Sequence, residues 1–402
     1  MPVMHINTSE FFRIAVASDI HAYDNINDDS APSHLRITEP ENEPGKHPIA
    51  GLIDLIEKEG LVADLFLSPG DLGDKAQPAG IQYAWKCLHQ VGEKLRAKLV
   101  TAASGNHDLD SRYIHNDYDA KGILLGLDPP YPLPDVSLND RYWARNFVII
   151  EGDEYRLIIL NTCAYHGTAQ DEITHGRIAD STLSGLRNEL SKIEPKIINI
   201  LLCHHHPQQH MELRLGEYDV MKNGQLLLDL LSTGDFGRWL VIHGHKHHPK
   251  IAYASGVATS PVIFSAGSLC ANLYRELQTM ARNQFYLISL PYDDIDRIGL
   301  VGIIQAWDWA SGSGWAPAAG LSSGLPSVCA FGFRGDPRAF AKRVANLVVE
   351  EKMDWKSVQD SLPEVSYYTP LDAITLKKEL ERRHGLRVIE EKGLPKEIGR
   401  CL

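Results

Sequence analysis

Short apolar runs that end directly in polar motifs recur along this chain and limit the folds open to it. The clearest are residues 12–17 before SDIH, residues 64–68 before PGDLGD, and residues 98–103 before SGNHD. Short apolar runs of this kind are typical of strands buried on both faces. Stretches with helical spacing, 48–60 and 79–97, separate them. The alternation predicts an α/β fold with a site at the carboxyl ends of its strands.

The middle of the chain continues this pattern after a predicted hairpin at 146–162. A helix is expected at 177–192, and strands at 196–203 and 238–242 end in HHHP and HGHKHH. Further strands are expected at 261–265, 284–290 and 299–306.

Residues 311–327, SGSGWAPAAGLSSGLPS, are rich in small residues and proline, which predicts a boundary or linker. Two helices are expected beyond it, at 337–352 and 370–384. We therefore divide the chain into a catalytic domain, 1–318, and a small helical C-terminal accessory module of unknown role, 319–402.

Composition and charge exclude several classes of protein. The chain has 402 residues, of which 44% are hydrophobic and 23% charged, as in soluble globular proteins. A net charge of −12 argues against general affinity for nucleic acid or for an anionic membrane surface. The N-terminal sequence shows no secretory signal, no run reaches the ~20 apolar residues of a membrane span, and the six cysteines are scattered. These features predict a cytoplasmic protein with reduced thiols.

Five polar motifs follow predicted strands: Asp19-Ile20-His21, Gly70-Asp71-Leu72-Gly73-Asp74, Gly105-Asn106-His107-Asp108, His204-His205-His206-Pro207 and Gly244-His245-Lys246-His247. In an extended backbone, residues i and i+2 point the same way, so Asp19 and His21 can reach one metal. The same spacing relates His245 and His247. Donors of the His, Asp and Asn types without Cys favour Mn, Fe, Zn or Co.

Each motif alone has a simpler interpretation. A DxH triplet is common, GDLGD is more often a turn, and a His-rich run can bind metal adventitiously. It is the occurrence of all five, in this order and each at a strand end, that indicates a metal site.

Together the motifs resemble those of the calcineurin-like metallophosphoesterase superfamily, over residues 12–310. GNHD together with GDxxD is most similar to its class III cyclic-nucleotide phosphodiesterase and glycerophosphodiesterase branch, and is compatible with its nucleases and nucleotide hydrolases. The resemblance implies a four-layer αββα sandwich of two mixed β-sheets.

The resemblance also implies two divalent metal ions with a bridging hydroxide that attacks the phosphorus. Carried over by position, one ion is held by Asp19, His21, Asp71 and His247. The other is held by Asp71, Asn106, His205 and His245. His205 is chosen because the family's ligand lies two residues before a proline, here Pro207.

Other residues receive expected roles beside the metals. His107 is expected to contact a phosphate oxygen or protonate the leaving group. Asp108 either orients His107 or caps a turn, and Asp74 either orients a ligand histidine or is a turn residue. Asn106, His107 and Arg177 are the candidates for substrate contact.

The expected activity is hydrolysis of a small, nucleotide-like phosphodiester. Alternatives are a phosphomonoesterase acting on a metabolite or protein, and a nuclease. A non-enzymatic metal-binding scaffold is disfavoured because every ligand position is intact. The expected partner is a small-molecule phosphoester, with no membrane, and the C-terminal module offers a route to a homo-oligomer or a protein partner.

Overall fold

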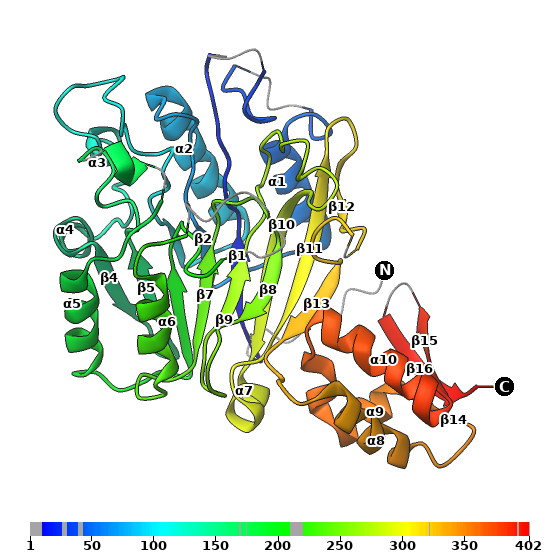
Figure 1. Ribbon diagram of the computed structural model, residues 1–402. Coiled ribbons are helices and arrows are strands. Elements are labelled where there is room, and N and C mark those ends of the chain that lie inside the picture. Colours follow the sequence, from blue (N-terminus) through cyan, green and yellow to red (C-terminus); the bar gives the residue numbers. More distant parts are fainter. Residues whose placement is uncertain are drawn as a thin grey trace.

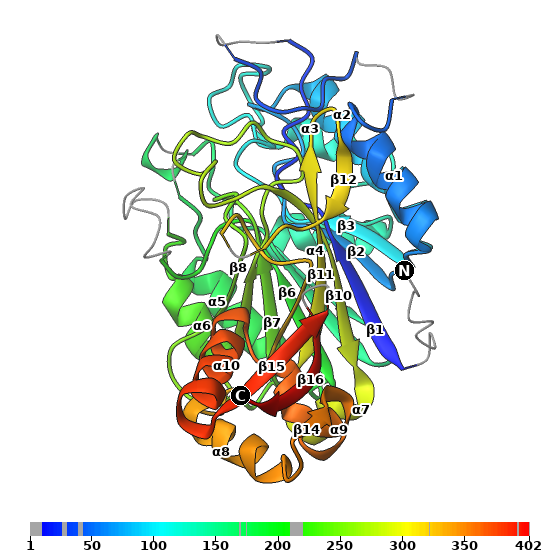
Figure 2. The ribbon, with the colours of Figure 1, turned by 90° about the vertical axis from the view of Figure 1, so that its right-hand side faces the viewer.

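Two large β-sheets form the centre of the molecule, and helices lie against them (Figures 1 and 2). The computed structural model describes residues 10–25, 30–38, 43–168, 170–173, 175–209, 220–320, 322–391 and 394–401. Residues 22–47 are polar and contain Pro32, Pro40, Pro44 and Gly45, which predicts a long loop, and parts of this stretch lie outside the described residues. The four-layer α/β sandwich expected from the resemblance is confirmed.

The first sheet has the order β12-β11-β10-β1-β2-β3, with β13 also paired to β11. Strands β1, β2 and β3 are parallel, whereas β10 to β13 join antiparallel. The parallel strands carry their polar motifs to one edge. The bounds are β1 Phe11–Val16, β2 Leu65–Ser68, β3 Leu99–Ala102, β10 Asn283–Pro291, β11 Gly302–Ala310, β12 Gly314–Pro317 and β13 Val328–Phe331.

The second sheet has the order β4-β5-β6-β7-β9-β8, and β5, β6, β7 and β9 are parallel. Its edge strand β8 has no counterpart among the predicted strands. The bounds are β4 Phe147–Glu151, β5 Tyr155–Leu160, β6 Ile198–Leu202, β7 Trp239–His243, β8 Lys250–Tyr253 and β9 Val262–Ser265.

Strand β5 shows how the second sheet is buried on both faces. Leu157 and Ile159 belong to the core cluster that also contains residues of β1, whereas Ile158 and Leu160 pack with residues of α5 and α6. Successive side chains point to opposite faces of a strand, so one continuous apolar run fills two cores.

The helices begin and end where local chemistry predicts. Helix α1, Pro48–Glu59, starts with proline in its first turn and ends at Gly60, whose φ of 63° is left-handed. The other helices of this body are α2 Pro78–Lys94, α3 Gly122–Leu125, α4 Val136–Arg145, η1 Gln170–Ile173, α5 Asp180–Leu190, α6 Gly224–Ser232 and α7 Tyr292–Ile298.

The C-terminal module differs from the small helical module predicted. Besides its helices it has a three-stranded sheet in the order β14-β16-β15, built on the β15–β16 hairpin. Its elements are α8 Pro337–Leu347, β14 Lys352–Asp354, α9 Trp355–Ser361, η2 Pro363–Tyr367, α10 Pro370–His384, β15 Leu386–Glu391 and β16 Leu394–Arg400.

The predicted boundary also needs correction. Residues 314–317 of the expected linker form β12, and β13 lies past residue 318 but still in the large sheet. Glycine and proline content was misleading here because strands at a sheet edge tolerate both.

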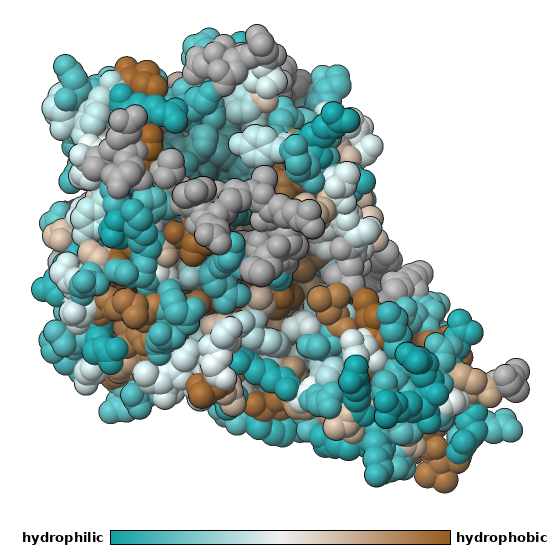
Figure 3. Space-filling view, viewed as in Figure 1, coloured by the Kyte–Doolittle hydropathy of each residue, from teal (hydrophilic) through white to brown (hydrophobic). Residues whose placement is uncertain are grey.

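The module packs at the end of the sheets beside α7, away from the strand ends that carry the polar motifs (Figure 1). The guanidinium of Arg334 lies 4.2 Å from the ring centroid of Tyr253 and donates to the carbonyl of Ser260. The hydroxyl of Tyr367 donates to Asp294 in α7. The face in Figure 3 is mostly hydrophilic, with apolar side chains in small separate groups. No helix in the described part of the chain has the length and apolarity to span a membrane.

Candidate metal centre

Backbone hydrogen bonds join the loops that follow β1 and β2. The backbone N–H of Asp19 donates to the carbonyl of Gly70 at 3.0 Å, and that of Ile20 donates to the carbonyl of Asp71 at 2.8 Å. Ser18 donates to the carboxylate of Asp19. These hydrogen bonds therefore fix the positions of the Asp19 and Asp71 loops relative to each other at the strand ends.

Asp108 is the buried clamp of these loops. Its two carboxylate oxygens accept from the backbone N–H groups of Asp71 at 2.9 Å, Leu72 at 2.7 Å, Gly73 at 3.3 Å and Gly105 at 2.9 Å. Burial, and then the charge of Asp71, raise the pKa of Asp108 to about 7 despite these donors. Asp108 thus shapes the loop.

Four donor atoms from both sheets meet at one point. Nε2 of His204 lies 2.9 Å from Oδ1 of Asn106 and 3.3 Å from Oδ2 of Asp71. Nδ1 of His245 lies 2.9 Å from the same Asn106 oxygen and 3.2 Å from Nε2 of His204. Two imidazole nitrogens, a carboxylate and an amide oxygen are a donor set suited to a divalent transition metal.

A second donor set lies beside the first. Nε2 of His247 lies 3.3 Å from Oδ1 of Asp19 and 3.1 Å from Nε2 of His21. Nε2 of His21 is 3.7 Å from Oδ2 of Asp71, the same oxygen that faces His204. Asp71 is therefore the carboxylate that both sets share.

These separations fit cations. A metal with bonds of about 2.0–2.2 Å to N and O donors sets neighbouring donors roughly 2.9–3.5 Å apart, and all the distances given above except the 3.7 Å between His21 and Asp71 lie in this range. Burial lowers the pKa of His245 to about 3 and that of His21 to about 3, so both rings are neutral, as ligands must be.

The carboxylates of the two sets call for positive charge. Although burial opposes ionisation, His204 holds the pKa of Asp71 well below its usual value. In the same way, His247 lowers that of Asp19 to about 2. Burial disfavours a charged His204 too, yet Asp71 outweighs it and raises the pKa of His204 to about 9. The buried carboxylates therefore favour a positive charge at this position, which a bound cation would supply.

Five donors occupy left-handed backbone. The φ angles are 51° at Asp19, 50° at His21, 55° at Asp71, 78° at His245 and 52° at His247. Non-glycine residues rarely adopt such angles, which concentrate at functional sites. The predicted pairing of residues i and i+2 through an extended backbone is therefore wrong, because these pairs converge through strained loops beyond the strand ends.

The fourth motif, His204-His205-His206-Pro207, places its side chains differently from the prediction. His204, not His205, meets Asn106 and Asp71. Nδ1 of His205 instead lies 2.9 Å from Oγ1 of Thr162 and 3.8 Å from the sulfur of Cys163. Counting back from the proline chose His205 because the sequence does not reveal which way each ring turns after β6.

His107 lies at the open side of the donor sets. Its Nδ1 is 3.3 Å from Oδ1 of Asp74 and 3.2 Å from the backbone nitrogen of Lys75. Burial lowers its pKa, but Asp71 and Asp74 outweigh burial and raise it above the usual value. The carboxylate at His107 is thus Asp74. Asp108, offered as its orienting residue, instead accepts the loop N–H groups.

Arg177 turns to an acidic partner. Its guanidinium donates to Glu172 with contacts of 3.0 and 3.2 Å, and Lys222 lies 3.6 Å from the same carboxylate. Arg177 is absent from the residues that line the cleft at the donor sets. The structure does not bring it to Asn106 and His107.

A cleft of 1260 Å³ opens from the donor sets, and sequence reasoning missed most of its wall. Beyond the donors and His107, its lining comes from the segments 30–34 and 271–283, together with Asp74, Lys75, Ile173, Lys246 and Trp309. Burial lowers the pKa of Lys246 to about 8. No motif marks the 271–283 segment, because its contribution depends on tertiary position.

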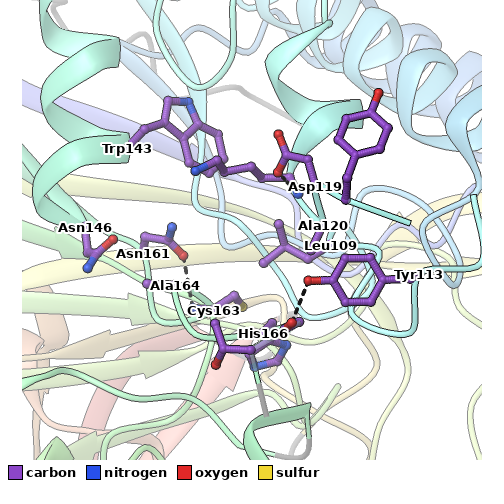
Figure 4. Close-up of a pocket in the computed structure, with 14 residues that line it drawn as sticks. Leu109, Tyr113, Asp119, Ala120, Trp143, Asn146, Asn161, Cys163, Ala164 and His166 are labelled. Carbon is purple, nitrogen blue, oxygen red and sulfur yellow. Dashed lines mark hydrogen bonds between the residues drawn. The ribbon is translucent and has the colours of Figure 1, made fainter. Parts of the chain in front are cut away.

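A smaller pocket of 180 Å³ is lined by residues that include Trp143, Cys163 and His166 (Figure 4). Trp143 and Asp119 lie across it from Cys163 and His166. Cys163, His166 and His205 each offer a donor atom within 4.8 Å of the others.

Comparison with known proteins gives one family. The family model described as calcineurin-like phosphoesterase matches residues 12–249. No curated protein matches the chain. Among solved structures, the purple acid phosphatase PPD1 of yellow lupin has 12% identity and a TM-score of 0.43, over 75% of this chain and 52% of that chain. PhoD has 7% identity and a TM-score of 0.44, over 81% and 74%. The NAD nucleotidase NadN of Haemophilus influenzae has 13% identity and a TM-score of 0.33, over 77% and 54%. The chain spans about half the length of PPD1 and of NadN.

Proposed function

Because the chain belongs to the calcineurin-like phosphoesterase family, we propose that it hydrolyses a small phosphodiester with two divalent cations. The family makes the chain a metal-dependent phosphoric ester hydrolase. The number of cations and the diester preference are the proposal. The observation that carries it is the pair of donor sets that share Oδ2 of Asp71.

One cation would be held by Asp19, His21, Asp71 and His247, and the other by Asp71, Asn106, His204 and His245. His204 replaces His205 in this assignment because its Nε2 lies among the other donors. Oxygen and imidazole donors are compatible with Mn, Fe, Zn or Co.

The charges of the donors suit an anionic substrate. Asp19 and Asp71 bring two negative charges against four from two divalent ions, which leaves a surplus for a phosphodiester anion. When bound, such a metal pair would supply an activated water and stabilise the attacking and leaving oxygens.

His107 would provide the proton for the leaving group. Burial lowers the pKa of His107, but Asp71 and Asp74 outweigh burial and raise it, and Asp74 lies 3.3 Å from Nδ1 so that Nε2 is the nitrogen left to serve the substrate. Among the described residues, His107 also lines the cleft, where a leaving group would lie.

The size of the cleft supports a diester over a simple monoester. A phosphodiester has an organic group on each side of phosphorus, and a volume of 1260 Å³ accommodates both. The wall offers Tyr274, whose side chain is exposed, and the buried Leu277 to the apolar parts of a nucleotide-like substrate.

A matched pair of chromogenic substrates tests this function. Protein loaded with Mn²⁺ should hydrolyse bis-p-nitrophenyl phosphate with a higher kcat/KM than p-nitrophenyl phosphate. Predominant turnover of the monoester would contradict the diester preference. Metal analysis of the same sample should give two ions per chain, and one ion would contradict the dinuclear assignment.

A further inference from the structure

A third group of buried donor atoms lies outside the two donor sets. Cys163, His166 and His205 each offer one donor atom, and these atoms lie within 4.8 Å of one another. Each of the three residues exposes at most 5% of its surface. Cysteine sulfur and imidazole nitrogen are the donors that zinc sites in proteins use most. The group therefore has the chemistry of a metal site that the catalytic assignment leaves unused.

A backbone carbonyl prepares His166 for this role. Its Nε2 lies 3.1 Å from the carbonyl oxygen of His175, and a carbonyl can only accept, so Nε2 carries the proton. The lone pair is then on Nδ1, which is buried and meets no hydrogen-bond partner among the described residues. Histidines that bind metals usually donate their other ring N–H in this way, which fixes the tautomer. A cation would give Nδ1 the partner that it lacks.

The imidazole of His205 has a similar surplus. Its Nδ1 lies 2.9 Å from Oγ1 of Thr162, whereas its Nε2 is buried without a partner in the part of the chain that the structure describes. The sulfur of Cys163 lies 3.8 Å from Nδ1 of the same ring. A tetrahedral zinc ion, with bonds of about 2.3 Å to sulfur and 2.0–2.1 Å to nitrogen, sets these two donor types roughly 3.6 Å apart. Sulfur and imidazole thus lie at nearly the spacing that one ion requires.

The pocket of 180 Å³ supplies room for a further ligand of such an ion. Cys163 and His166 line this pocket, and Trp143 and Asp119 lie across it (Figure 4). Zinc sites with three protein donors commonly keep a water at the fourth position. The pocket offers that position.

We propose that Cys163, His166 and His205 bind a third metal ion, Zn²⁺, whose fourth position faces the pocket. The sulfur of Cys163 donates to the carbonyl of Ser104 at 3.1 Å, so the metal-free residue is a thiol. Its proton passes to solvent when the bond between zinc and sulfur forms. The resulting thiolate offsets half of the charge of the ion, which limits repulsion from the two catalytic cations.

This ion supports the catalytic centre without joining it. The ring centroid of His205 lies 4.9 Å from that of His204 and 4.5 Å from that of His245. An ion that fixes the ring of His205 therefore also restricts the motion of the two imidazoles that pack against it.

Titration with Co²⁺ separates this ion from the catalytic pair, because it alone would have a sulfur ligand. Co²⁺ bound to thiolate has an intense charge-transfer absorption in the near ultraviolet, which nitrogen and oxygen ligands do not produce. Metal-free protein titrated with Co²⁺ should develop this absorption and hold three ions per chain. Added Zn²⁺ should remove the absorption, because it binds such donors more tightly than Co²⁺. Mn²⁺ suits oxygen donors and should stop at two ions.

Two variants and one control decide the assignment. Cys163→Ser should abolish the absorption and keep two ions, and the retained ions also report that the variant is folded. His166→Asn should raise the Co²⁺ concentration at half-saturation of the absorption at least about tenfold. Cys329→Ser makes the same change at another buried cysteine, in β13, and should keep the absorption and all three ions.

Two results would overturn the third site. One is a wild-type chain that takes up Co²⁺ without the thiolate absorption. The other is an absorption that survives in Cys163→Ser or is unchanged in His166→Asn. Neither result touches the proposed hydrolysis, which the assay of Mn²⁺-loaded protein tests by itself.

Discussion

The two sheets contribute different chemistry to one centre. Loops of the first sheet supply both carboxylates and the amide, together with His21, whereas loops of the second sheet supply only imidazoles from His204, His245 and His247. The loops of the first sheet therefore supply all the negative charge among the donors, whereas the loops of the second sheet supply only donors without negative charge. Because each donor set draws on both sheets, the centre exists only when the two halves are packed together.

The largest effect is expected from the residue on which both sets depend. Asp71→Asn removes the shared negative charge and should lower kcat on the order of 1000-fold or more, since a metal pair supplies several kcal/mol of stabilisation. Metal content should fall below one ion per chain. A variant that keeps both ions and its activity would contradict the assignment of Asp71 as the ligand that the two donor sets share.

Adjacent histidines on the second sheet offer a sharper comparison. His204→Asn replaces an imidazole donor by a shorter and weaker amide and should cost at least about 100-fold in kcat/KM, while His205→Asn should cost less than about tenfold. Metal analysis of both variants gives an independent measure. The reverse order of losses would restore His205 as the ligand.

Substitution of Asp108 tests whether the loops of the first sheet depend on the hydrogen bonds that its carboxylate accepts. Asp108→Asn sets an amide NH₂ against backbone N–H donors, leaves some of them unpaired, and should lower the free energy of unfolding by about 2–4 kcal/mol. Denaturant unfolding of metal-free protein measures this. Asp117→Asn, an exposed change of the same kind, is the control and should be neutral. Equal stability of the two variants would contradict the clamp.

Protons should compete with metal ions for the imidazole of His204, which the second sheet supplies. His204, with its pKa raised to about 9, must lose a proton before it can bind metal. Affinity should therefore fall as pH drops below 9, by up to about tenfold per pH unit. Titration calorimetry at pH 7.5 in two buffers of different ionisation enthalpy should show about one proton released. No release, or the same release in His204→Asn, would contradict this assignment.

The sequence predicts the α/β class well because buried parallel strands leave continuous apolar runs, whereas the four-layer sandwich is implied only by the family resemblance. It also predicts the loops that hold the donors, since each motif follows such a run. It does not predict which imidazole after β6 points to the donors, because His204, His205 and His206 are adjacent and of the same residue type. The sheet of the C-terminal module escapes prediction for a similar reason, because its short, largely exposed strands lack the apolar signal.

The left-handed angles at Asp19, His21, Asp71, His245 and His247 have a consequence for how this chain can change. Each such residue costs roughly 1–2 kcal/mol, which glycine would largely avoid. Selection for stability alone should therefore favour glycine at these five positions, and these substitutions would remove the metal donors. A stabilising screen of this protein therefore needs an activity filter, because its cheapest gains lie where its chemistry is done.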